Sequence, residues 1–268
     1  FWEVEKAKEL HKPITHGAGV FAIAFASDGK SIASGGKDRI VRLFDIATGA
    51  PKRRWMGHVG DISALAMSPD GTLLISGSVD GTGKAWNTAQ SSGEEVIAAH
   101  ADWVQCLALN AKGTLLASGS RDGSVKLWDA ATGNLVKEVA TLQGAITSVA
   151  MSSHKDTTLL AVGTRTDASS GEIRVYQIDS DKSGHTVKEK TTLSINGKGI
   201  TALAFSPRSD SAYLLAAGSS SARVTLFDLD KGKEVASYSE HKDEVRSISF
   251  FEDGKLFASA GKDGIVYL

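Results

Sequence analysis

The sequence predicts an all-β fold, and three observations lead to this prediction. Segments such as ISALAMS (62–68) alternate apolar and polar residues between turns rich in Gly, Asp and Pro, which is typical of short antiparallel strands. No window has the apolar periodicity of a long helix. The chain also repeats itself with a period of 42 residues, at which His16, His58 and His100 recur.

Six repeat units follow this period. Three of them carry closely related segments, SGGKDRIVRLFDIATG (34–49), SGSVDGTGKAWNTAQ (76–90) and SGSRDGSVKLWDAATG (118–133), and changed copies lie near 161–179, 216–232 and 258–268. A full unit has four alternating segments separated by turns, which predicts four strands. We expect one domain over residues 1–268, with repeats at about 16–57, 58–99, 100–141, 142–195, 196–240 and 241–268.

A lone four-stranded sheet of this size cannot bury both of its apolar faces. Sheets that pack face to face around an axis bury each face against a neighbour. The repeats therefore predict a β-propeller whose blades are four-stranded antiparallel sheets.

Several short motifs make the chain resemble the WD40-repeat β-propeller family over essentially its whole length. They are Gly57-His58, the SGSxDG motifs at 76–81 and 118–123, and Trp128-Asp129. The resemblance implies that each blade links a His, a Ser, an Asp and a Trp by hydrogen bonds, because leaving one such buried group unpaired costs about 1–3 kcal/mol. The matching sets are His58, Ser76, Asp80, Trp86; His100, Ser118, Asp122, Trp128; His16, Ser34, Asp38; and His241, Ser259, Asp263.

Ser, His and Asp together would also suit a hydrolase. Nucleophilic catalysis needs a single constellation with an oxyanion site, whereas here the same residues recur at one phase in successive units. We interpret them as structural and expect no catalytic residue. Other units depart from the pattern, with Phe44 at the Trp position of the first, Leu142, Val162, Thr166 and Tyr176 in the fourth, and Asn196, Ala217, Ser221 and Phe227 in the fifth.

Composition excludes several classes of partner. The chain has 30 Lys and Arg against 31 Asp and Glu without a long block of one sign, so we expect no nucleic-acid partner. The longest apolar run, 18–26, is about half the length of a membrane-spanning helix, so no membrane insertion is expected. The single cysteine, Cys106, fits a reducing, cytoplasmic location. No cluster of residues predicts a metal or another cofactor.

The resemblance also implies a binding face, formed by the loops before the first strand and between the second and third strands. The candidate partner-binding residues there are Phe21, Lys37, Asp61, Trp103, Gln105, Arg121, Glu244, Arg246 and Lys262. Trp103 is the strongest candidate, because alternation directs Val104 and Cys106 to the opposite face. Its aromatic ring and the nearby Arg121 are side chains common at interaction hot spots.

These observations lead us to expect a non-catalytic scaffold that mediates protein–protein interactions. It would act as a subunit or module of a larger, hetero-oligomeric assembly. The alternative is an adaptor that reads an acidic or phosphorylated peptide with the same face, where Lys37, Arg121, Arg246 and Lys262 supply positive charge. A propeller enzyme is the least favoured class.

The two ends of the chain leave the closure of the ring open. Trp2 precedes His16 by 14 residues, the same step as from Trp86 to His100. Residues 1–15 are therefore expected to complete a terminal blade with the end of a third strand and an outer strand, which the last repeat lacks. Either Trp2 takes the Trp position of the last unit in a six-bladed ring, or the two ends belong to different blades of a seven-bladed one.

Overall fold

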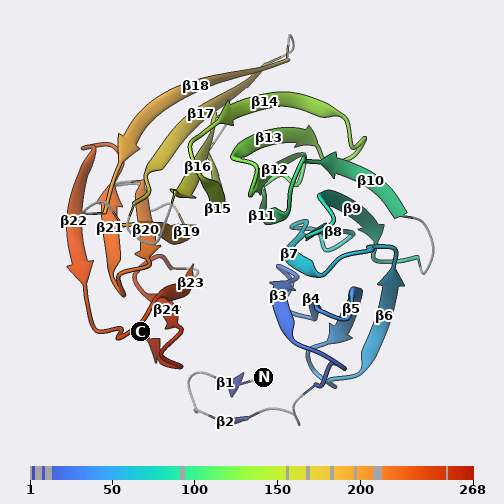
Figure 1. Cartoon of the computed structure of the whole chain (residues 1–268). Helices are drawn as coiled ribbons and strands as arrows, with labels where there is room; N and C mark the ends of the chain where they lie inside the picture. Colours follow the sequence, from blue (N-terminus) through green and yellow to red (C-terminus); the bar gives the residue numbers. More distant parts are fainter. Residues whose placement is uncertain are drawn as a thin grey trace.

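The computed structural model describes residues 2–3, 8–9, 14–90, 94–154, 157–166, 170–181, 184–195, 198–207, 213–251 and 253–268. These residues form six antiparallel sheets that stand around an axis as the blades of a β-propeller (Figure 1). The predicted all-β propeller fold is confirmed. Within the described ranges, no helix is long and apolar enough to cross a membrane.

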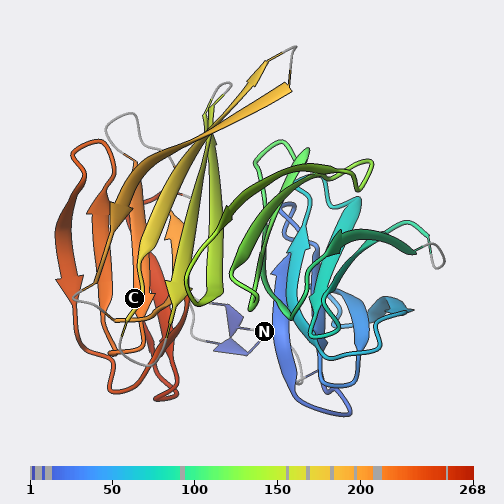
Figure 2. The ribbon, with the colours of Figure 1, turned by 45° about the horizontal axis from the view of Figure 1, so that its top comes forward.

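Each blade begins with a strand beside the axis and adds strands outward in chain order (Figures 1 and 2). Blade 1 contains β3 (Val20–Phe25), β4 (Ser31–Gly36), β5 (Ile40–Asp45) and β6 (Pro51–Met56); blade 2 contains β7 (Ile62–Met67), β8 (Leu73–Ser78), β9 (Thr82–Asn87) and β10 (Glu94–Ala99). Blade 3 contains β11 (Val104–Leu109), β12 (Leu115–Ser120), β13 (Ser124–Asp129) and β14 (Leu135–Thr141).

The fourth and fifth blades follow the same order. Blade 4 contains β15 (Ala145–His154), β16 (Thr157–Arg165), β17 (Ile173–Asp181) and β18 (Gly184–Leu193); blade 5 contains β19 (Ile200–Phe205), β20 (Leu214–Ser219), β21 (Val224–Asp228) and β22 (Lys233–Tyr238). The strands of blade 4 are longer than those of the other blades, and its β17–β18 hairpin projects beyond the rim in Figure 1.

The two ends of the chain form smaller sheets. Blade 6 has three described strands, β23 (Val245–Phe250), β24 (Phe257–Gly261) and β25 (Val266–Tyr267). At the other end, β1 (Trp2–Glu3) and β2 (Lys8–Glu9) pair with each other in a separate two-stranded sheet. Both ribbon views place this sheet between blade 6 and blade 1 (Figures 1 and 2). The assignment of residues 1–15 to a terminal blade stays a prediction.

One close contact recurs between neighbouring blades. The inner strands of blades 2 to 6 carry a fully buried β-branched residue at their first or second position, namely Ile62, Val104, Ile146, Ile200 and Val245. Each packs on a glycine in the second strand of the preceding blade, namely Gly35, Gly77, Gly119, Gly163 and Gly218. A Cβ atom added to Gly77 would lie 2.6 Å from Cγ1 of Val104. The glycine of the SGS motif is therefore needed for this close approach.

Apolar clusters fill the space between the blades. The largest cluster of buried residues joins blades 4 and 5 and includes Leu159, Ile173 and Phe227. A second large cluster, which includes Leu127 and Tyr176, joins blades 3 and 4. The blades that lack the repeated polar residues thus have the most extensive apolar contacts among the described residues.

A methyl group at the recurring glycine should force neighbouring blades apart. We expect Gly77→Ala to lower the free energy of unfolding by about 1–3 kcal/mol, the usual cost of overpacking. Urea denaturation followed by circular dichroism measures this change. Gly17→Ala is the matched control, because nothing lies within 4 Å of the added Cβ. Equal stability of the two variants would contradict the close-contact explanation.

Candidate interaction face

Blade 2 contains the complete set of hydrogen bonds that the repeat predicts. The indole Nε1 of Trp86 donates to Oγ of Ser76 at 2.8 Å, and this oxygen lies 2.8 Å from Nε2 of His58. On the other side of the ring, Nδ1 of His58 lies 3.0 Å from a carboxylate oxygen of Asp80. The chain of bonds fixes the loop that enters blade 2 to the sheet of the same blade.

Blade 3 has the same arrangement with one change. The indole of Trp128 donates to Ser118 at 2.7 Å, and Nε2 of His100 lies 2.7 Å from the same hydroxyl. Nδ1 of His100, however, bonds Oγ of Ser124 at 2.7 Å, while Asp122 lies 3.6 Å away. The Asp122 carboxylate accepts instead from two backbone N–H groups.

Blades 1 and 6 contain partial sets. Nε2 of His16 lies 2.7 Å from Ser34, and the Arg42 guanidinium donates both to Nδ1 of His16 at 2.9 Å and to Asp38 at 2.6 Å. In blade 6, His241 lies 2.9 Å from Ser259 and 3.0 Å from Asp263, and its ring packs edge-on against Tyr267. Arg42 is a member of the set that the sequence pattern did not identify.

Blades 4 and 5 lack this set. Tyr176 takes the Trp position of blade 4, but Val162 replaces the serine that would accept a hydrogen bond from it. The buried Tyr176 hydroxyl has no hydrogen-bond partner among the described residues. In blade 5, Phe227 is buried at this position and Asn196 lies outside the described residues.

Burial decides the protonation state of the histidines in blades 2 and 3. It lowers the pKa of His58, and the nearby Asp80 opposes this shift only in part. Burial likewise lowers the pKa of His100, against the opposing charge of Asp122. For Asp80, burial raises the pKa, but hydrogen bonds from Thr82 and His58 outweigh it, so the net shift is downward. The rings are therefore neutral and the carboxylate ionised near pH 7.

All six blades contribute to one cavity of about 580 Å³, which lies where their inner strands and turns converge. Seven of the predicted partner-binding residues line it: Phe21, Asp61, Trp103, Gln105, Arg121, Glu244 and Arg246. Lys37 and Lys262 do not, although both are exposed. We call this surface the axial face.

Trp103 and Arg121 form an exposed pair on the axial face. The Arg121 guanidinium lies over the Trp103 ring, 4.8 Å from its centroid, and 3.9 Å from the Asp102 carboxylate. Trp103 is 42% exposed, whereas the next residue, Val104, is fully buried. The pair therefore presents an aromatic surface and a positive charge to solvent.

Glu244 has a different environment from the one expected of a contact residue. Its side chain is buried, and its two carboxylate oxygens pair with Arg165 at 2.9 Å and Arg246 at 3.0 Å. This ion pair joins blade 4 to blade 6 across the axial face. Arg165 lies at the turn position of the fourth unit that corresponds to Arg121 in the third, and it also lines the cavity.

Small hydroxyl residues on the axial face bond the next blade. Ser63 donates to the carbonyl oxygen of Val104, and Thr147 donates to that of Ile200 at 2.6 Å. These hydroxyl groups line the cavity but are already used in contacts between blades. No group of three or more His, Cys, Asp or Glu side chains that could hold a metal ion occurs in the described part of the chain.

Comparison with known proteins identifies repeats of one family. The WD40 family model, described as "WD domain, G-beta repeat", matches residues 7–45, 49–87, 93–129 and 232–268, more than half of the chain. Each matched segment begins close to β2, β6, β10 or β22, and ends at or near the third strand of the following blade. An 82-residue segment is 30% identical to the WD repeat-containing protein 91 homolog of Dictyostelium discoideum, and covers 31% of this chain and 10% of that relative.

The unpaired hydroxyl of Tyr176 should contribute nothing to stability. We expect Tyr176→Phe to leave the free energy of unfolding unchanged or to raise it by up to about 1 kcal/mol. Trp128→Phe, by contrast, removes the bond to Ser118 and should cost about 1–3 kcal/mol. Urea denaturation measures both variants. A loss in Tyr176→Phe as large as that in Trp128→Phe would show that the hydroxyl does have a partner.

Acid should destabilise the propeller in two steps. A histidine in an unfolded chain has a pKa of about 6.5, which is higher than the lowered pKa of His58 and His100 in the folded chain. As the pH falls, the unfolded state therefore takes up protons first, and the free energy of unfolding decreases below about pH 6.5. The lowered pKa of Asp80 adds a second loss below about pH 4. Thermal melting measured across this range tests both steps. His58→Gln with His100→Gln should flatten the first step, and an unaltered first step in this variant would exclude these rings as its cause.

Proposed function

The chain belongs to the WD40 repeat family, and we propose that it is a non-catalytic scaffold that binds other proteins as one component of a larger assembly. Propellers of this family typically bind proteins and are generally non-catalytic. The polar residues that would suggest a hydrolase are used within single blades, where they bond one another. The cytoplasmic location stays a prediction.

The observation that carries this proposal is the exposed Trp103–Arg121 pair on the axial face. Aromatic and arginine side chains supply most of the binding energy at protein interfaces, particularly near the centre of the contact. Phe21, 57% exposed, adds a second aromatic ring to the same cavity. Because inner strands and short turns hold these side chains, they lose little conformational freedom when a partner binds.

A second candidate, an adaptor for acidic or phosphorylated peptides, is supported by the charge of the cavity. Three arginines line it, Arg121, Arg165 and Arg246, against two carboxylates, Asp61 and Glu244. Because Glu244 is held between two of these arginines, its charge is already compensated. Arginine is well suited to carboxylate and phosphate groups, which it can bind with two parallel hydrogen bonds.

The scaffold proposal predicts that partners are lost when the exposed pair is removed. We expect Trp103→Ala with Arg121→Ala to reduce recovery of the partners at least tenfold in affinity purification followed by mass spectrometry, because two hot-spot side chains each contribute about 2 kcal/mol or more. Folding should be retained, since both side chains are substantially exposed.

The matched control is Leu135→Ala with Lys137→Ala, which removes two exposed side chains from the outer strand of the same blade. This control should recover the same partners as the unaltered chain. If both double variants recover all partners equally, the axial face is not the binding site. An adaptor for acidic peptides further requires that added salt weakens binding in the unaltered chain, because exposed charges are screened.

A further inference from the structure

Two arginines on the axial face converge on one carboxylate. Nη1 of Arg165 lies 2.9 Å from Oε1 of Glu244, and Nη2 of Arg246 lies 3.0 Å from Oε2. The Glu244 side chain is 11% exposed, whereas the Arg165 and Arg246 side chains are 33% and 57% exposed. The carboxylate is therefore enclosed between two guanidinium groups whose residues line the cavity.

Blade 5 leaves space for this contact, although Arg165 belongs to blade 4 and Glu244 to blade 6. A Cβ atom added to Gly199 would lie 2.7 Å from Cγ and 3.1 Å from Cδ of Arg165. Thr201 of blade 5 lines the cavity too, but its hydroxyl donates to the carbonyl oxygen of Val245. The lack of a side chain at position 199 therefore lets Arg165 extend across blade 5 to Glu244.

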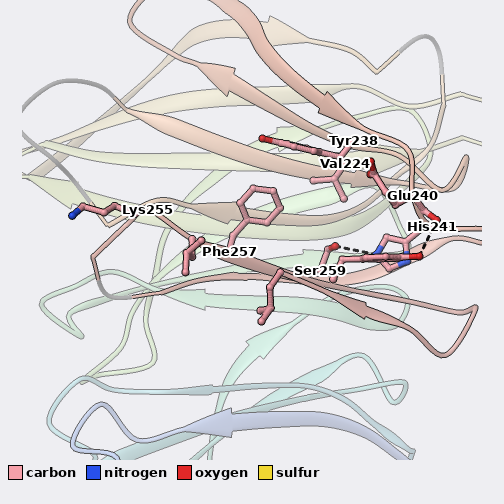
Figure 3. Close-up of a pocket in the computed structure, with 10 residues that line it drawn as sticks. Val224, Tyr238, Glu240, His241, Lys255, Phe257 and Ser259 are labelled. Atoms are coloured by element: carbon pink, nitrogen blue, oxygen red, sulfur yellow. Dashed lines mark hydrogen bonds between the residues drawn. The ribbon is translucent and has the colours of Figure 1, made fainter. Parts of the chain in front are cut away.

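The loop that enters blade 6 holds Glu244 in place. Nε2 of His241 lies 2.9 Å from Oγ of Ser259, a hydrogen bond that is drawn in Figure 3. The backbone carbonyl oxygen of Glu244 accepts from the backbone N–H of Lys262 at 2.8 Å. A fixed backbone thus presents the carboxylate to both arginines, and the side chain loses little conformational freedom in the contact.

A carboxylate from a partner offers these arginines nothing that Glu244 does not already supply. Both groups carry one negative charge on two oxygen atoms. Glu244 is part of the chain, so its effective concentration at the arginines exceeds that of a peptide in solution. The Asp or Glu side chain of a partner must displace an equal group that is already bound. The ion pair therefore acts against peptides that are merely acidic.

A phosphate group differs from a carboxylate in both charge and number of oxygen atoms. Phosphoserine or phosphothreonine carries a charge of about −1.5 to −2 near pH 7 and has three acceptor oxygens. These oxygens can accept hydrogen bonds from both guanidinium groups at once, and such charge-assisted bonds are strong. A phosphate can therefore displace Glu244 from Arg165 and Arg246 where a carboxylate cannot.

We propose that Glu244 is an internal competitor that makes the axial face select phosphorylated peptides against unphosphorylated acidic ones. The inference rests on the adaptor function proposed above, and it assigns the phosphate to Arg165 and Arg246. When the peptide binds, the Glu244 carboxylate turns to solvent and the phosphate takes its place between the guanidinium groups. Arg121, which lies over the Trp103 ring, contacts another part of the peptide.

Asp61 provides a matched comparison within the same cavity. It lies at the same repeat position as Glu244, three residues after the histidine of its blade, and it also lines the cavity. The ion pairs between described residues include Glu244 but not Asp61. Replacing either residue by its amide removes one negative charge from the cavity. Only the change at Glu244 leaves the two arginines without their carboxylate.

The test compares two pools of fluorescent peptides that differ at one residue. The central residue is phosphoserine in one pool and aspartate in the other, and the flanking positions are mixed in the same proportions. Fluorescence anisotropy measures the affinity of each pool for the unaltered chain, for Glu244→Gln and for Asp61→Asn. We expect the unaltered chain to bind the phosphoserine pool at least tenfold more tightly than the aspartate pool.

The two variants separate competition from the overall charge of the cavity. Glu244→Gln should bind the aspartate pool at least tenfold more tightly than the unaltered chain does. Asp61→Asn should gain about threefold or less, because the charge of an exposed side chain is screened by solvent and salt. Arg246→Gln, at a substantially exposed side chain, should weaken binding of the phosphoserine pool at least tenfold even if Glu244→Gln does not fold.

Small anions give a readout at the two arginines themselves. Inorganic phosphate and sodium acetate are titrated separately, and the Nε–Hε signals of Arg165 and Arg246 are followed by NMR spectroscopy. In the unaltered chain, we expect phosphate to shift both signals and acetate to shift neither. In Glu244→Gln, both anions should shift them. A purely structural role of Glu244 predicts no such change in the response to acetate.

Four results would overturn the inference. They are equal binding of both pools by the unaltered chain, equal gains in aspartate binding by Glu244→Gln and Asp61→Asn, unchanged phosphoserine binding by Arg246→Gln, and binding of inorganic phosphate as tight as that of the phosphoserine pool. The last result would make the free ion the ligand. Each of them leaves the scaffold function intact if Trp103→Ala with Arg121→Ala still loses its partners, so the two proposals fail separately.

Discussion

The close approach of neighbouring blades at a glycine is the constraint on which the rest of the structure depends. The inner strand of one blade can pack against the second strand of the preceding blade only where that second strand carries a residue without a side chain. Gly77, which packs against Val104, is an example. This contact positions the start of each inner strand, and the residues that line the axial face lie next to it. Trp103, for example, immediately precedes Val104. The binding surface is thus placed by the same packing that holds the ring together.

The blades are stabilised in two ways. Blades 2 and 3 use buried hydrogen bonds among His, Ser and Trp side chains, which fix the entering loop in one position. Blades 4 and 5 lack these bonds and share the largest apolar cluster instead. Apolar burial supplies free energy without directional constraint, whereas the hydrogen-bond sets add specificity of geometry. The difference explains why repeats with little resemblance to the others still fold as blades.

The 42-residue period was sufficient to predict the propeller, because a repeat constrains all its copies at once. The resemblance to the WD40 family, carried over at the phase of the repeat, placed Trp103 and Arg121 on the axial face, and strand alternation supported the outward direction of Trp103. Spacing could not predict the ion pair between Arg165 and Glu244, which depends on the longer loops of the fourth unit and on contacts between distant blades. Nor did it show that Lys37 and Lys262 do not line the cavity, because long exposed side chains are not directed by the backbone alone.

The order of the blades also bears on how the chain folds. Every extensive contact between blades joins consecutive units, so the residues that meet are separated by little more than one repeat. Low contact order of this kind favours rapid folding, and the ring can grow one blade at a time from whichever pair forms first. A link between the first and last blades would be the single step of high sequence separation, and therefore the slowest to form. We therefore expect the propeller to assemble by the stepwise addition of each blade to its neighbour in the chain.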